Sequence, residues 1–183
     1  MRHLLTAFAF LLVLGTVTVS AQPATLFEQP VLITSAGQSA DVTMAGMICK
    51  RVKVEAKAAP TATEADLKGF KTLMIVPGFS SKGLGAAGTS REQEMDRIRK
   101  VIDAAKKNKM RIMMVHIGGK ARRGAQSDDF NELAMVSSEY AIVVKAGDED
   151  GFFAAIAKKH NIPLEAVDRI PDAQKPVEAA FAK

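Results

Sequence analysis

Three segments rich in glycine, serine and basic residues carry most of the side chains in this chain that could bind a ligand. They are residues 35–39 (SAGQS), 78–88 (GFSSKGLGAAG) and 116–124 (HIGGKARRG). Glycine lets backbone N–H groups approach a ligand closely, and lysine or arginine adds positive charge. The combination predicts a pocket for a small anionic or polar molecule, such as a carboxylate, a phosphate or a sulfate.

The residues expected to line this pocket would contribute three kinds of interaction. They are backbone donors at Gly37, Gly83, Gly85 and Gly119, polar side chains at Ser35, Gln38, Ser80, Ser81 and His116, and cations at Lys82, Arg122 and Arg123. The competing interpretation is that the glycines serve tight turns and that the cations lie in water. Under the ligand hypothesis, Lys82→Ala and Arg122→Ala should weaken binding and leave the melting temperature nearly unchanged.

A hydrolytic site is the alternative use of the same segments. Ser80 or Ser81 could act as a nucleophile, with His116 as its base and Asp128 as the acid that orients the histidine. The nucleophile-elbow pattern G-x-S-x-G is incomplete, because Lys82 stands at the position of its second glycine. The sequence therefore favours a binding protein over an enzyme.

Sequence patterns known from cofactor-binding and metal-binding proteins are either incomplete in this chain or lack the neighbouring elements that they require. Residues 83–88 match the dinucleotide pattern G-x-G-x-x-G, but residues 77–82 separate them from the preceding apolar run, where the pattern should follow directly. No P-loop is present, because Lys82 precedes Gly83. The soft potential metal ligands are Met44, Met47, Cys49, Met113, Met114 and His116. Their spacing is typical of core packing, so we expect neither a cofactor nor a metal.

Short apolar runs alternate with longer amphipathic segments along the chain, which predicts strands that alternate with helices. Strands are expected at residues 31–34, 52–55, 72–76, 111–115 and 141–144, with a sixth at 166–170. Helices are expected from about residue 40, over 63–69, from 89 or 90, from 127, from 150 and around Pro176. The pattern predicts a three-layer, doubly wound, mostly parallel α/β sheet of five or six strands, flavodoxin-like or Rossmann-like.

In the flavodoxin-like strand order 2-1-3-4-5, the ligand crevice opens between the first and third strands. The carboxyl ends of parallel strands share one edge of the sheet. The three glycine-bearing segments each follow a predicted strand, so they should meet at that edge.

The first 21 residues have the composition of a secretory signal peptide. Arg2 precedes an apolar stretch over residues 4–14, and Val19 and Ala21 supply the small residues that signal peptidase requires. We therefore expect a cleaved signal over 1–21, one domain over 22–183, and export to the periplasm or the medium. No membrane attachment is expected after cleavage.

Composition narrows the class of partner. The net charge is +5, with no tryptophan and one tyrosine, so few side chains could stack on bases and nucleic acid is not an expected partner. The single cysteine, Cys49, excludes an internal disulfide, and its apolar neighbours predict a buried thiol.

Residues 29–39, 80–88 and 116–124 resemble a bacterial family of exported single α/β domains without an assigned function. The resemblance covers nearly the whole mature chain and implies an α/β domain made behind a signal peptide, with no implied activity. We expect an exported binding domain for a small, anionic or polar ligand. The alternatives are a serine-dependent hydrolase and a protein-interaction module of an envelope complex.

Overall fold

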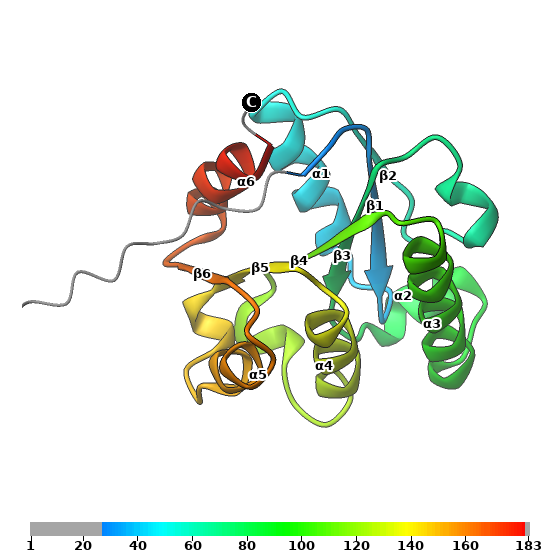
Figure 1. Ribbon diagram of the computed structural model, residues 1–183. Coiled ribbons are helices and arrows are strands. Elements are labelled where there is room, and N and C mark those ends of the chain that lie inside the picture. Colours follow the sequence, from blue (N-terminus) through cyan, green and yellow to red (C-terminus); the bar gives the residue numbers. More distant parts are fainter. Residues whose placement is uncertain (1–26, 182–183) are drawn as a thin grey trace, which may run out of the picture.

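A computed structural model describes residues 27–181 (Figure 1), so the expected signal peptide lies outside the described residues. These residues form one parallel sheet of six strands in the order β2-β1-β3-β4-β5-β6. The strands are β1 (Val31–Ala36), β2 (Ala56–Ala58), β3 (Thr72–Pro77), β4 (Arg111–His116), β5 (Tyr140–Val144) and β6 (Leu164–Val167). The predicted α/β fold is confirmed, and β6 extends the expected strand order.

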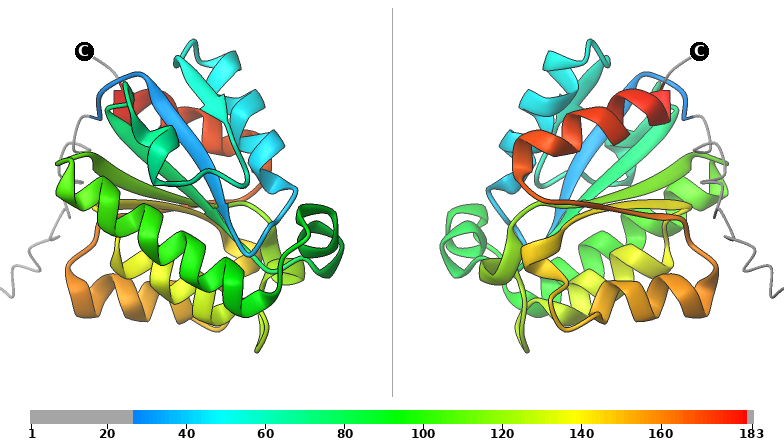
Figure 2. Two further views of the ribbon diagram at one scale, coloured as in Figure 1. Left: turned by 90° about the vertical axis from the view of Figure 1, so that its right-hand side faces the viewer. Right: turned by 90° about the vertical axis from the view of Figure 1, so that its left-hand side faces the viewer.

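Helices cover both faces of the sheet. The helices are α1 (Asp41–Arg51), α2 (Ser81–Ala87), α3 (Arg91–Lys107), α4 (Asp128–Val136), α5 (Phe152–His160) and α6 (Gln174–Phe181). Short 3-10 helices are η1 (Glu64–Leu67), η2 (Gly119–Arg122), η3 (Lys145–Gly147) and η4 (Ile170–Ala173). α1 and α6 lie on one face, and α3, α4 and α5 lie on the other (Figure 2). No helix within 27–181 combines the length and apolarity that crossing a membrane needs.

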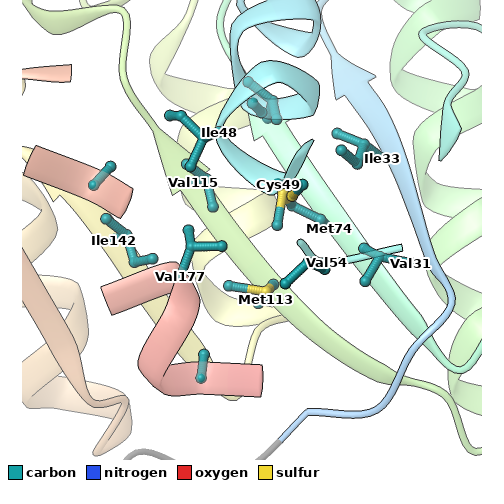
Figure 3. Packing of buried hydrophobic residues seen from close by; sticks show 14 of the residues in the cluster. Val31, Ile33, Ile48, Cys49, Val54, Met74, Met113, Val115, Ile142 and Val177 are labelled. Atoms are coloured by element: carbon teal, nitrogen blue, oxygen red, sulfur yellow. The ribbon is translucent and has the colours of Figure 1, made fainter. Parts of the chain in front are cut away.

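Two hydrophobic cores form because alternate strand residues face opposite sides of the sheet. Val31, Met74 and Met113 pack with Ile48 of α1 and Val177 of α6 on one side (Figure 3). The intervening strand residues pack against α3, α4 and α5 on the other side. They include Leu32, Leu73, Ile75 and Met114. β1, β3 and β5 are buried along their whole length, as expected for parallel strands covered on both faces.

Cys49 belongs to the α1 core, as predicted, and is 0% exposed. Burial raises the pKa of its thiol to about 11, so the thiol stays protonated at neutral pH.

Three elements differ from the sequence prediction. Residues 52–55 are the exit from α1: Val52 is the C-cap, Lys53 has a φ of 59°, and the second strand begins only at Ala56. The last strand covers Leu164–Val167 and not 166–170. Helix α2, which was not predicted, forms within the glycine-rich segment 78–88.

Candidate functional site

The three glycine-bearing loops do meet at the carboxyl edge of the sheet, and they bind one another there. The Gly78 amide donates to the Ala36 carbonyl and the Ser80 amide to the Gly37 carbonyl, both at 2.8 Å. Gln38 and Phe79 form an isolated antiparallel bridge. These backbone contacts join the loop after β1 to the loop after β3.

Two of the predicted ligand-binding glycines are needed for this backbone packing. A Cβ at Gly37, which has a φ of 101°, would lie 2.7 Å from the Gly78 carbonyl oxygen, and a Cβ at Gly83 would overlap the Gln38 carbonyl oxygen. In contrast, a Cβ at Gly85 would meet nothing within 4 Å. At Gly119 the φ of 56° favours glycine, and the nearest atom, 3.6 Å away, would be the Cβ of Ala146.

The two serines after β3 begin helix α2. The Ser80 hydroxyl is the N-cap and accepts from the Gly83 amide at 3.1 Å. Ser81 and Lys82 are exposed in the first turn, and Gly88 ends the helix in the left-handed conformation. The apparent dinucleotide pattern over residues 83–88 is therefore the body and C-cap of a short helix.

Arg122 joins its own loop to the loop after β3 and to the first residue of α1. Its Nη1 donates to the Phe79 carbonyl at 3.0 Å, and its Nε lies 3.3 Å from Oδ2 of Asp41. Its aliphatic stem lies against Gly78 and Gly118, where any Cβ would collide with it. The side chain that was predicted as a ligand clamp thus holds the loops together.

Arg123 is likewise engaged within the protein. Its Nε donates to Asp128 at 2.8 Å, its Nη2 donates to Asp150 at 2.9 Å, and its Nη1 donates to Asp150 and the Gly147 carbonyl. The guanidinium stacks over the Phe152 ring at 4.3 Å. Hydrogen bonds from Arg123 hold the pKa of Asp150 down at about 2.

A small cavity of about 280 Å³ lies beside Arg123, and its charged lining is internally paired. Lys120 binds Glu149 at 2.5 Å, and Arg123 binds Asp128 and Asp150. No group of three or more His, Cys, Asp or Glu residues within 27–181 is arranged to hold a metal ion.

His116 lies in the core and not beside the serines. Its side chain is 0% exposed, its Nε2 is 3.2 Å from the Arg122 carbonyl oxygen, and its ring centroid is 4.7 Å from that of Phe153. Burial lowers the pKa of His116 to about 4. Within the described residues, no hydrogen bond joins His116 to Ser80, Ser81 or Asp128, so the hydrolytic set is not assembled.

The remaining predicted polar residues make internal contacts. The buried hydroxyl of Ser35 donates to the Val76 carbonyl at 3.5 Å. Asp128 accepts from Arg123 and also from the Asn131 amide, at 3.0 Å. Gln38 donates through Nε2 to the Pro60 carbonyl and to Glu94, at 3.2 and 2.9 Å.

A larger cavity, of about 580 Å³, opens beside Gln38 on the α3 side of the sheet. We call it the α3 cavity. Its lining comes from the loops after β1 and β2, the start of η1, the end of α2 with the turn that follows it, and residues 93–100 of α3. The lining residues are Gln38, Thr61, Glu64, Ala87, Gly88, Thr89, Gln93, Glu94, Asp96, Arg97 and Lys100. Gln38 alone among the predicted ligand-binding residues lines it.

The floor of the α3 cavity is a buried ion pair. Glu94 is 0% exposed, and its two oxygens accept from the Gly37 amide and Gln38 Nε2, both at 2.9 Å. Arg97 donates to the same carboxylate through Nε and Nη2, both at 2.7 Å. Arg97 also donates to Thr34 and to the carbonyls of Ala62 and Ser35. All its N–H donors therefore meet acceptors in the protein.

The walls of the α3 cavity carry charges that the protein leaves unpaired. Glu64, Asp96 and Lys100 are exposed and form no ion pair within residues 27–181. Thr61 and the Gln93 side chain add polar groups to the same walls. This set can offer hydrogen bonds and charge of both signs to a bound molecule.

Most residues of the α3 cavity have no distinctive sequence pattern, but Glu94 does. It falls in register with Ile98, Val101 and Ala105, which form the apolar stripe of α3. An acid on a buried stripe requires a partner, and Arg97, one turn away, is in reach.

Comparison with known proteins gives one family match. The model of a family described as a domain of unknown function (DUF6305) matches residues 28–181. No curated protein matches the chain. The predicted resemblance to an uncharacterised domain family is thereby confirmed.

Proposed function

We propose that this chain, which belongs to the family of domains of unknown function (DUF6305), binds a small polar ligand in the α3 cavity. One contrast carries the proposal. Around the α3 cavity, Glu64, Asp96 and Lys100 form no ion pair with any other residue that the structure describes, whereas Arg122 and Arg123 after β4, which the sequence singled out, are paired with acids of the protein. Unpaired polar groups around a preformed cavity at the carboxyl edge of a parallel sheet are typical of a ligand site.

The charges of the walls define the class of ligand. The ion pair of Glu94 with Arg97 is internally neutral and saturated, which leaves the acids Glu64 and Asp96 and the base Lys100 for a ligand. A zwitterion such as a free amino acid presents an ammonium group to the acids and a carboxylate to the lysine. A simple anion would meet more negative than positive charge. The proposal therefore narrows the expected anionic or polar ligand to a zwitterionic or hydroxyl-rich one.

Hydrolysis gains no support from the geometry. A base must reach the nucleophile and the substrate, but His116 is buried against Phe153 and the Ser80 hydroxyl caps α2. Binding a ligand requires only a preformed cavity with polar groups available to the ligand. The α3 cavity has the Glu94–Arg97 ion pair as its floor and the unpaired side chains of its walls.

A thermal-shift screen with glutamine, glucose, inorganic phosphate and citrate tests the ligand class. We expect glutamine or glucose to raise the melting temperature more than phosphate or citrate. In the variant Asp96→Asn/Lys100→Ala this shift should disappear, because two of the three unpaired wall charges are lost and only Glu64 remains. A larger shift with the anions that survives in this variant would refute the assignment to the α3 cavity.

The same helix supplies a matched control. Asp103 and Lys107 repeat the spacing of Asp96 and Lys100 and are exposed, but they lie outside the cavity. The variant Asp103→Asn/Lys107→Ala removes the same chemical groups from α3 and should retain the full ligand-induced shift. Equal losses in the two double variants would indicate a general electrostatic effect and not a site.

Export is part of the proposed role. A chain expressed with residues 1–21 intact should be recovered outside the cytoplasm with a new N-terminus near Gln22. Edman sequencing or mass spectrometry of the recovered protein reads that terminus. A mature protein that still begins at Met1 would contradict export.

A further inference from the structure

A second surface, on the opposite side of the sheet, has the features of a protein-docking site. Exposed large hydrophobic side chains are few in residues 27–181, and two of the three, Met44 and Met47, lie on α1 at 37% and 42% exposure. A groove of about 620 Å³ runs between α1 and β2. Its lining residues are Thr43, Gly46, Met47, Lys50, Lys53, Val54, Glu55, Ala56 and Ala58. It shares no residue with the α3 cavity.

The backbone of β2 is open on the outer side of this groove. β2 is the first strand of the sheet and pairs only with β1 (Figure 2). The hydrogen bonds toward β1 use the Glu55 carbonyl and the Ala59 amide. Because alternate residues of a parallel strand face the same neighbour, Ala56 and Ala58 direct their N–H and C=O groups away from the sheet. An added extended segment can bind those groups.

The side chains beside this open edge leave room for an incoming segment. Ala56 and Ala58 are small, and Gly46 of α1 lies opposite Ala58, where even a Cβ on the glycine would make only an ordinary contact, 3.7 Å from the alanine Cβ. Met47 forms the outer apolar wall. The groove therefore fits an apolar side chain of a strand laid along β2, since methionine adapts its shape to a partner.

The charges around the groove identify the kind of partner. Lys50 and Lys53 line it and Arg51 lies between them in sequence, all exposed, against the single acid Glu55. This basic surplus attracts an acidic segment. It also repels a second copy of the same edge, because two copies would bring lysines against lysines.

We propose that the α1–β2 groove binds an extended, acidic segment of a partner protein, which adds as a strand along β2. Backbone groups of Ala56 and Ala58 would pair with the segment. An apolar side chain of the segment would contact Met47, and its carboxylates would face Lys50 and Lys53.

Fluorescence anisotropy with a short labelled peptide of alternating valine and aspartate tests this. We expect the full chain to bind this acidic peptide. Its affinity for a peptide of alternating valine and lysine should be lower by roughly tenfold or more. Met47→Asp and Lys50→Glu/Lys53→Glu should each weaken binding of the acidic peptide by roughly tenfold. Insertion of proline in the peptide should abolish binding, because proline cannot donate to a strand edge.

Control variants keep the test specific to the groove. Val136→Asp replaces the third exposed large hydrophobic residue, on α4, and Lys107→Glu reverses an exposed charge on α3. Both should bind the acidic peptide like the parent, and circular dichroism should show the same melting temperature for all variants. Absence of binding, equal binding of the acidic and basic peptides, or equal losses in Val136→Asp would overturn the proposal.

Discussion

Glu94 and Arg97, one turn apart on α3, form a doubly hydrogen-bonded ion pair whose two N–O distances are both 2.7 Å. The carboxylate is 0% exposed and also accepts from the Gly37 amide. Through this pair, α3 holds the loop that follows β1 and forms the floor of the α3 cavity. The ligand binding that we propose for the cavity would therefore require that the pair remain intact.

Removal of one partner of this pair should be strongly destabilising. Glu94→Ala leaves the Arg97 guanidinium, whose side chain is only 16% exposed, without its counter-charge, and we expect a loss of about 3 kcal/mol in the free energy of unfolding. Urea denaturation measures it. The exposed acid Asp103 on the same helix is the control, and Asp103→Ala should change the stability by less than about 0.5 kcal/mol. Equal, small effects of the two substitutions would contradict the structural role of the pair.

Arg122 and Lys82, both predicted as ligand clamps, should behave differently when truncated. Arg122→Ala removes the contacts to Asp41 and the Phe79 carbonyl and the packing over Gly78, so we expect a loss of about 2 kcal/mol. Lys82→Ala should leave the melting temperature unchanged because the side chain is exposed. This replaces the expectation that both variants melt like the parent. Identical melting curves for the two would show that Arg122 does not join the loops.

Two glycines of α2 provide a matched pair with opposite expected signs. Gly85→Ala adds a methyl group in open space and improves helix propensity, so it should stabilise by about 0.5–1 kcal/mol. Gly83→Ala would force a methyl group into the Gln38 carbonyl and should destabilise by about 1–3 kcal/mol. Thermal denaturation of both variants measures the two changes in stability. Stabilisation by both would mean that the β1 and β3 loops are not closely packed.

His116 should make the stability depend on pH below neutrality. Burial lowers its pKa to about 4 in the native state, while the unfolded chain has a value of about 6.5. As pH falls below about 6.5, His116 becomes protonated in the unfolded state, whereas in the native state it stays neutral until about pH 4. The free energy of unfolding therefore has its full value above about pH 6.5 and decreases as pH falls from about 6.5 to about 4. Between pH 7 and pH 4.5 the loss should be about 2 kcal/mol.

Urea denaturation of the parent and of His116→Phe at these two pH values isolates the histidine. Other titrating groups contribute to both proteins, so the difference between their pH-dependent losses belongs to His116. The variant should lose about 2 kcal/mol less than the parent over this interval. The same loss in both would show that His116 is not buried in its neutral form.

β3 and β5 were predictable because residues 72–76 and 141–144 are almost entirely apolar. β2 was misplaced because Ala-Lys-Ala carries no strand signal and pairs only through its backbone with β1. Helix α2 was missed because its glycines suggest a loop. Its formation depends on the Ser80 cap and on the close contact of Gly83 with Gln38, which is a tertiary effect.

Of the candidate ligand site, only its place at the carboxyl edge of the sheet and the residue Gln38 could be predicted from the sequence. Lysine and arginine suggest ligand contacts, but their partners decide what they do, and Arg122 finds Asp41 at a sequence separation of 81 residues. Nothing local in the sequence indicates that pair. For Glu94 the signal was local, because an acid stands on the apolar stripe of α3.

Amide chemical-shift mapping of the chain with glutamine, or with glucose if it gives the larger thermal shift, tests the ligand site most directly. We expect perturbations concentrated at Thr61, residues 87–89 and Gln93, which line the α3 cavity, and little change at Lys82 or residues 122–124. Perturbations concentrated at Lys82 and residues 122–124, with none at Thr61 or Gln93, would contradict it.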